Sequence, residues 1–248
     1  EGRGRRPRQA ASAEQTFTEQ VHFEVDAMSL LGLFDDPEAD YWGWDYVVGG
    51  NAIMGTKAFT LPLEGVSPHG VATLKVDLHG GTDRAADPDH HAVVRLNGTE
   101  VASGMWDGLK AHKLTASFDQ GLLRAGDNLV EVTALLDTGA SYSIFYVDSF
   151  DLSYERHYEA VDDALMCRGD GNEIVTIGGF SERDIWVLDV MDPLAPELVT
   201  ATRVDREGDA YRVSFRPASP ETPYLVVTPG ATSDPTGVAG RTSSGLRR

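Results

Sequence analysis

Apolar and polar residues alternate with a period of two along most of this chain, and the pattern predicts an all-β protein. The clearest stretch lies between residues 89 and 156, where runs rich in Val, Leu, Phe and Tyr are separated by short segments containing Gly or Asn. Asn97-Gly98 stands between two such runs. This pair favours a tight hairpin, because both central residues of a type I′ turn need positive φ. The spacing is typical of an antiparallel β-sandwich.

The alternation divides the chain into two units. In the first unit the expected strands cover residues 21–25, 56–63, 71–79, 91–96, 100–106, 112–118, 128–136 and 142–154, close to the count of a jelly roll. In the second they cover residues 164–167, 173–178, 184–190, 197–204, 209–216 and 223–228. We therefore predict a jelly-roll or galactose-binding-like sandwich over residues 19–156 and a smaller all-β domain over residues 157–228.

The two ends of the chain lack this periodicity. Residues 1–18 begin with a basic run and are expected to form a disordered lead-in, and residues 229–248 a disordered tail rich in Gly, Ser and Thr. The sequence has neither an initiating Met nor a hydrophobic signal core. We therefore expect a mature, processed or truncated product whose targeting segment is not visible.

Composition excludes two classes of partner. A net charge of −18 and a pI near 4.6 argue against nucleic acid, which is bound by Lys and Arg that neutralise phosphates. The apolar runs are much shorter than the ~20 residues that a membrane-spanning helix needs. The one cysteine, Cys167, has no histidine tied to it by sequence. A buried structural thiol is therefore favoured over a nucleophile.

Acidic loops are the candidate metal sites. Asp83, Asp87 and Asp89 could supply the oxygen ligands that Ca²⁺ prefers, although Asp and Pro also begin and end loops for conformational reasons. A second candidate loop contains Asp35, Asp36, Glu38 and Asp40. His90 and His91 are adjacent on a predicted strand and point to opposite faces, so they cannot jointly bind one metal. No cofactor is required by the sequence; calcium is the possible one.

Three tryptophans are candidate ligand-binding residues. Trp42, Trp44 and Trp106 could form a platform for stacking on sugars, but the core of a sandwich also uses tryptophans, and core packing is the favoured interpretation.

The motifs together resemble one peptidase family. VHFEVD, YWGWDYVVGG, the LNGTEV–LLRAGDN pattern and VDSFDLSYER resemble the N-terminal region of gingipain-type cysteine peptidases. The later stretch IVTIGGFSERDIWVLDVMDPLAPELV is similar to the linker β-domain that precedes their catalytic domain. The resemblance covers residues 19–228. Galactose-binding-like jelly rolls and carbohydrate-binding modules share much of the pattern.

The resemblance implies a secreted or cell-surface precursor whose caspase-like domain, with its His–Cys dyad, would follow residues 224–227. This chain has no such dyad, so catalysis would belong to the parent endopeptidase. The chain would pack against that domain, assist its folding or restrain it. Trp186 and Tyr224 are the expected contact residues and should be partly exposed, because so small a unit has little core. A carbohydrate-binding module is the alternative, and catalysis near Cys167 or His90 a third hypothesis.

Overall fold

The computed structural model describes residues 15–33, 41–233 and 237, and it divides between His157 and Tyr158 into two compact units. The predicted all-β class is confirmed. Within the described residues the helical segments are three single 3₁₀ turns: η1 (Leu31–Leu33), η2 (Gln120–Leu122) and η3 (Pro229–Ala231). No helix in this part of the chain has the length and hydrophobicity required to cross a membrane.

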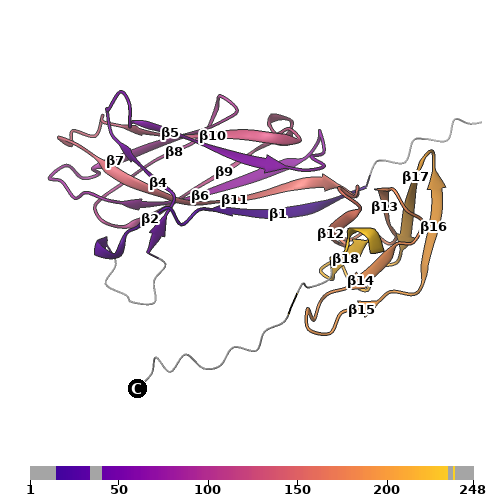
Figure 1. Cartoon of the computed structure of the whole chain (residues 1–248). Helices are drawn as coiled ribbons and strands as arrows, with labels where there is room; N and C mark the ends of the chain where they lie inside the picture. The colour runs from indigo at the N-terminus through magenta and orange to yellow at the C-terminus, as the bar shows by residue number, and fades with distance from the viewer. Residues whose placement is uncertain (1–14, 34–40, 234–236, 238–248) are drawn as a thin grey trace, which may run out of the picture. The chain divides into compact units, whose positions relative to one another are not determined.

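The first unit is a sandwich of two antiparallel sheets (Figure 1). One sheet has the order β1 (Thr16–Glu24), β11 (Ile144–His157), β6 (Val71–Gly80) and β9 (Ala111–Asp119), and β4 (Asp45–Val48) also pairs with β11. The other has the order β5 (Thr56–Leu63), β10 (Gly126–Leu135), β7 (His90–Leu96) and β8 (Thr99–Trp106). The short strands β2 (Met28–Ser29) and β3 (Trp42–Gly43) form a separate pair.

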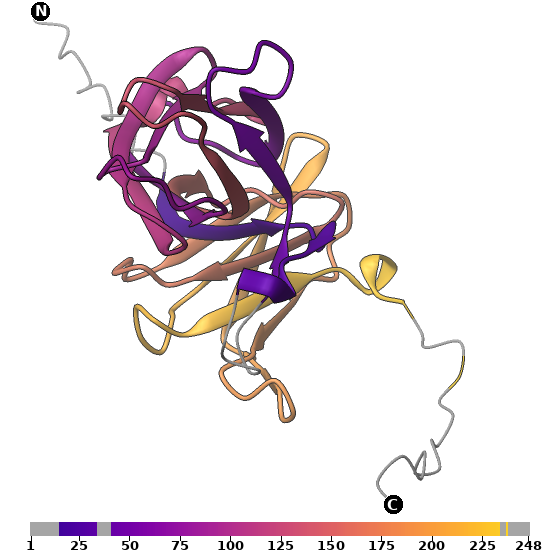
Figure 2. The ribbon, with the colours of Figure 1, turned by 90° about the vertical axis from the view of Figure 1, so that its left-hand side faces the viewer.

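The inner faces of these sheets make one core, around which the strands of the first unit are arranged (Figure 2). Alternate residues of β6 and β10 contribute to it; for example, Leu74 and Val76 are 1% exposed and Val132 is fully buried. The residues between them face outward. Period-two alternation in the sequence therefore corresponds to the division between core and surface.

The Asn97-Gly98 turn connects β7 to β8, as predicted, with φ values of 50° and 84°. The Asn97 side chain organises this end of the sandwich. Its amide donates to the Leu122 carbonyl and to Asn128 Oδ1, while its Oδ1 accepts from Arg124 and from the Leu129 N–H. The LNGTEV and LLRAGDN segments are thus joined by one hydrogen-bond network.

The predicted lead-in extends too far. β1 begins at Thr16, because residues 16–18 pair with residues 155–157 of β11 and Phe17 enters the core at 1% exposure. The strand predicted over residues 21–25 is the later part of β1, and the polar residues around Phe17 obscure its start in the sequence. At the other end, η3 occupies residues 229–231 of the predicted tail. Residues 1–14, 234–236 and 238–248 lie outside the described residues.

The second unit also contains two antiparallel sheets. One has the order β12 (Ala164–Arg168), β18 (Pro223–Val227), β14 (Trp186–Asp189) and β15 (Glu197–Leu198); the other has the order β13 (Val175–Phe180), β17 (Ala210–Phe215) and β16 (Thr202–Glu207). The single strand predicted over residues 197–204 is wrong. The chain leaves the first sheet after Leu198 and enters the second at Thr202, so two short strands replace it.

Candidate functional site

The first predicted calcium site lies in the loop between β6 and β7, where Asp89 is a structural residue. Asp89 is fully buried; its Oδ1 accepts from the Gly108 N–H at 2.9 Å and its Oδ2 from the Arg84 N–H at 2.8 Å. Both carboxylate oxygens are therefore used to hold two loops. Within the described residues, no group of three or more His, Cys, Asp or Glu side chains could hold a metal ion. Asp35, Asp36, Glu38 and Asp40 lie outside the described residues.

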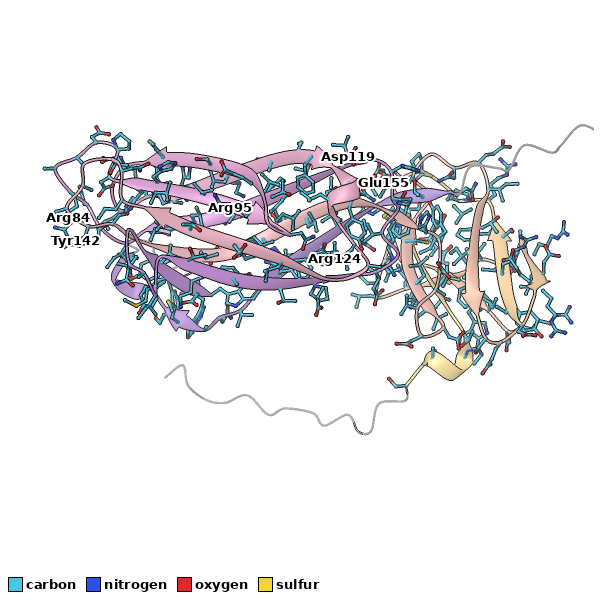
Figure 3. All side chains as sticks on the ribbon, turned by 90° about the horizontal axis from the view of Figure 1, so that it is seen from above. Arg84, Arg95, Asp119, Arg124, Tyr142 and Glu155 are labelled. Carbon is cyan, nitrogen blue, oxygen red and sulfur yellow. The ribbon has the colours of Figure 1, made fainter. Side chains whose placement is uncertain are left out.

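Acidic side chains nevertheless gather around this loop. Partial desolvation raises the pKa of Asp107, and the charges of Asp87, Asp89 and Asp83 raise it further. The charge of Lys110, 4.0 Å from the Asp107 carboxylate, opposes this rise, and the Arg84 guanidinium lies 3.7 Å from the centre of the Tyr142 ring (Figure 3). This end of the sandwich therefore carries mutually repelling carboxylates without a defined metal site.

A Ser–His–Asp arrangement, which the sequence analysis missed, lies behind the same loop. Ser143 Oγ is 2.7 Å from His90 Nδ1, and His90 Nε2 is 3.0 Å from the Thr82 carbonyl and 3.3 Å from Asp89 Oδ1. Because a carbonyl can only accept, Nε2 carries a proton, and in the neutral ring Nδ1 accepts from the serine hydroxyl. The signal was difficult to find, since Ser143 is 53 residues from His90 in the chain.

This arrangement is not a catalytic site. Ser143, His90 and Asp89 are all completely buried, so no substrate can reach the hydroxyl. The ring nitrogens also have the reverse roles from those of a serine hydrolase, in which Nε2 contacts the serine. The arrangement instead joins two loops of the sandwich. Cys167, on β12, is 2% exposed and faces the core of the second unit, as predicted for a structural thiol.

The three predicted tryptophans do not form a common platform. Trp106 is 8% exposed and lies between His90 and His112, with ring centroids 4.8 Å and 4.5 Å away. Trp44 packs edge-on against two core phenylalanines, Phe59 and Phe150. Only Trp42, at 37%, is exposed, with the neighbouring Tyr41 ring 5.6 Å from its own. Core packing therefore explains the positions of Trp106 and Trp44.

The outer face of the β1–β11–β6–β9 sheet is polar. Its register places His22, Asp151, Lys75 and Thr115 in one row and Gln20, Ser153, Thr73 and Ser117 in the next. Side chains of these rows line a half-open groove of about 350 Å³. Hydrogen bonds that the His22 ring donates to Glu24 and Asp151 raise the pKa of His22, although burial lowers it. The groove contains hydrogen-bonding groups, and its lining includes no Trp, Tyr or Phe side chain for stacking on a sugar.

The predicted contact residues of the second unit have different environments. Trp186 is 39% exposed. Tyr224 is 1% exposed, so the prediction that it is partly exposed is wrong. Tyr224 faces the space between the sheets, where its ring packs against Phe215 and its hydroxyl accepts from the Ala218 N–H. Even this small unit thus has enough core to bury a tyrosine.

The outer face of the β12–β18–β14–β15 sheet carries a row of apolar side chains beside Trp186, with the charged Arg168 at one end of β12. Met166 pairs with Leu225, Leu225 with Leu188, and Leu188 with Leu198. These four residues form one row across four strands, which we call the apolar row. The end members Met166 and Leu198 are 52% and 56% exposed, and Leu188 and Leu225 between them are half-buried. The inward-facing residues Val187 and Val226 are fully buried. Met191 and Leu194, in the loop after β14, add exposed apolar surface at 59% and 94%.

The second sheet of the same unit provides an internal comparison. Its outward residues include Thr176 and Ser214, whose hydroxyls are hydrogen-bonded, and Arg203 beside Ser214 in register. An apolar outer face is therefore a property of one sheet and not of the unit. Contiguous exposed apolar surface on a soluble protein commonly marks a contact with another protein. We regard the apolar row as the candidate functional site.

Comparison with known proteins gives a likeness in fold. No protein-family model matches this chain. No curated protein matches it either. Among solved structures, dimeric latent PorU from Porphyromonas gingivalis superposes with a TM-score of 0.63 at 13% identity. The match covers 88% of this chain and 21% of PorU, so this chain spans about a fifth of that protein's length.

Two carbohydrate-binding modules are similar over part of the chain. The CBM36-1 domain of a multidomain xylanase from the hindgut metagenome of Trinervitermes trinervoides has a TM-score of 0.34 at 10% identity, covering 54% of this chain and 96% of the module. A CBM36 module in complex with calcium and xylotriose has a TM-score of 0.31 at 12% identity, covering 56% and 93%. Scores this low carry no inference about ligands. The fold of this chain is thus similar to that of PorU through both of its β-units.

Proposed function

We propose that this chain is a non-catalytic module of a secreted, gingipain-type cysteine peptidase, and that its second unit packs against the caspase-like domain of that peptidase. The apolar row carries the proposal, because a soluble protein gains nothing from four apolar side chains aligned on an outer sheet face unless another surface covers them. The sequence motifs of the family and the likeness in fold to PorU support it.

The consequence of the contact would be restraint or assisted folding of the peptidase. The similar structure is that of a latent protein, which fits a module that restrains its neighbour. Restraint of this kind is steric and needs no chemistry from the module. It is consistent with the complete burial of Ser143, His90 and Asp89 and with the 2% exposure of Cys167.

Mixing the chain with a separately produced gingipain-type peptidase domain tests the proposal. We expect a one-to-one complex in analytical ultracentrifugation and slower hydrolysis of a small peptide substrate. The double variant Met166→Asp/Leu198→Asp should abolish both effects, because it places two charges on the apolar row. Both positions are more than half exposed, so the unit should still fold.

The matched control adds the same two charges elsewhere. Thr60→Asp/Thr115→Asp alters exposed positions on the outer faces of the first unit and should bind like the unmodified chain. If the unmodified chain forms no complex, or if both double variants bind equally well, the apolar row is not the docking site.

A further inference from the structure

All charged residues in the hairpin that carries Leu188 and Leu198 of the apolar row are acidic. Between residues 184 and 202, which include β14 and β15, there are four acidic residues and neither Lys nor Arg. These are Asp184, Asp189, Asp192 and Glu197. Three of the four are exposed, and Asp189 is partly exposed. The apolar row is therefore bordered on the side of Leu198 by negative charge.

Within the described residues these acids have no cationic partners, in contrast to acids on and beside the other sheet of the same unit. There, Asp205 lies 2.9 Å from Arg203, Glu207 lies 3.2 Å from Arg212, and Glu173 lies 2.9 Å from Arg216. Among the described residues, the four hairpin acids form no ion pair within 4.0 Å. Asp189 and Asp192 instead accept from the backbone N–H groups of Met191 and Leu194, which fixes their carboxylates on the loop.

This charge determines what can cover the apolar row. A partner that buries the row brings its own surface close to the hairpin, where unpaired carboxylates lose hydration unless cations replace the water. A second copy of this chain presents the same acidic hairpin, and the whole chain has a net charge of −18. Like charges at the rim therefore oppose self-association through this face.

We propose that the partner surface has an apolar centre bordered by Lys or Arg side chains that pair with Asp189, Asp192 and Glu197. The inference rests on the proposed function, since it specifies the surface of the docked peptidase domain. The apolar row supplies the contact area. The hairpin supplies orientation and selects against acidic partners, including a second copy.

The test measures affinity of the full chain for the same peptidase domain at low and high salt, about 0.05 M and about 0.5 M, because screening shortens the reach of charges. Asp189→Asn/Asp192→Asn/Glu197→Gln keeps the loop acceptors but removes three charges. We expect it to weaken binding about tenfold at low salt. Its affinity should also be nearly independent of salt, whereas that of the unmodified chain should fall.

The control removes three acids that lie on or directly beside the other sheet. Glu173→Gln/Asp205→Asn/Glu207→Gln should leave affinity and its salt dependence unchanged. A complex that Met166→Asp/Leu198→Asp abolishes, but that responds neither to salt nor to the hairpin variant, would sink this inference and leave the proposed function intact. If no complex forms under any condition, both this inference and the proposed function are wrong. Dimers of the unmodified chain that dissociate in Met166→Asp/Leu198→Asp would also overturn it.

Discussion

Two outer sheet faces of this protein, built in the same way, have opposite character. On the first unit a row crosses four strands as His22, Asp151, Lys75 and Thr115. On the second unit the equivalent row is Met166, Leu225, Leu188 and Leu198. Both sheets are antiparallel and bury the side chains of their inner faces. An apolar outer face is therefore not needed for folding, and its presence on one sheet indicates a contact.

The largest expected difference in the free energy of unfolding is between a substitution on the inner face and one on the outer face of the second unit. Tyr224→Ala should destabilise it by about 3–5 kcal/mol, because it removes a 1%-exposed ring from the core. Leu198→Ser on the outer face should change stability by about 0.5 kcal/mol or less. Urea unfolding of both variants measures the contrast. Equal losses would mean that the apolar row is part of the core and not a free surface.

The next largest effect is expected at Asp89, in the buried polar arrangement of the first unit. Asp89→Ala leaves the Gly108 and Arg84 N–H groups without their acceptor, and we expect a loss of roughly 3 kcal/mol. Asp83→Ala, in the same loop, is the control and should cost less than about 1 kcal/mol. Thermal or urea unfolding monitored in the first unit distinguishes them. A cost for Asp83→Ala as large as that for Asp89→Ala would contradict the structural role assigned to Asp89.

The inner and outer faces of the β1–β11–β6–β9 sheet each carry a histidine, and the two histidines make stability depend on pH in different ways. Burial, with a smaller effect of His90, lowers the pKa of His112 below 6.5, so its contribution to stability is present above that value and is lost as pH falls. Hydrogen bonds to Glu24 and Asp151 raise the pKa of His22, so its contribution is present below 6.5 and is lost as pH rises through the folded pKa. The two effects oppose each other.

Replacing one histidine at a time should therefore change the slope of stability against pH, and the two replacements should change it in opposite directions. His22→Gln should make stability fall more steeply between about pH 7 and about pH 5, and His112→Gln should make it fall less. Each change should be below about 1 kcal/mol, because His22 is largely exposed and screened. Melting temperatures across that range provide the measurement. Parallel slopes in the two variants would show that neither histidine titrates as described.

The smallest expected effect concerns calcium. Asp83, Asp87 and Asp107 lie near one another, and the described part of the chain holds no group of side chains that could bind a metal, so millimolar Ca²⁺ should only reduce their repulsion. We expect a rise in melting temperature of about one degree, reversed by chelator. Asp107→Asn should remove it. A rise of several degrees that Mg²⁺ does not reproduce would instead indicate a specific calcium site.

The sequence by itself determined the fold class, the two units and most strands. Alternation with period two specifies which side of each strand is buried, and Asn97-Gly98 specifies a hairpin, because these are local properties of the backbone. The same local rules found the later part of β1 but missed its start, since the polar residues around Phe17 show no alternation strong enough to reveal a strand. They also merged β15 and β16, because a short crossing between two sheets does not interrupt an apolar pattern.

Only the tertiary structure decided which candidate residues are available for function. Trp106 and Tyr224 are buried because rings from other strands enclose them. The Asp89 carboxylate already accepts a hydrogen bond from the N–H group of Gly108, 19 residues away in the chain. The Ser143–His90 contact and the apolar row depend on strand register between distant segments. Sequence spacing contains no record of that register. A face can therefore be recognised as unpaired only after the strands have been placed beside one another.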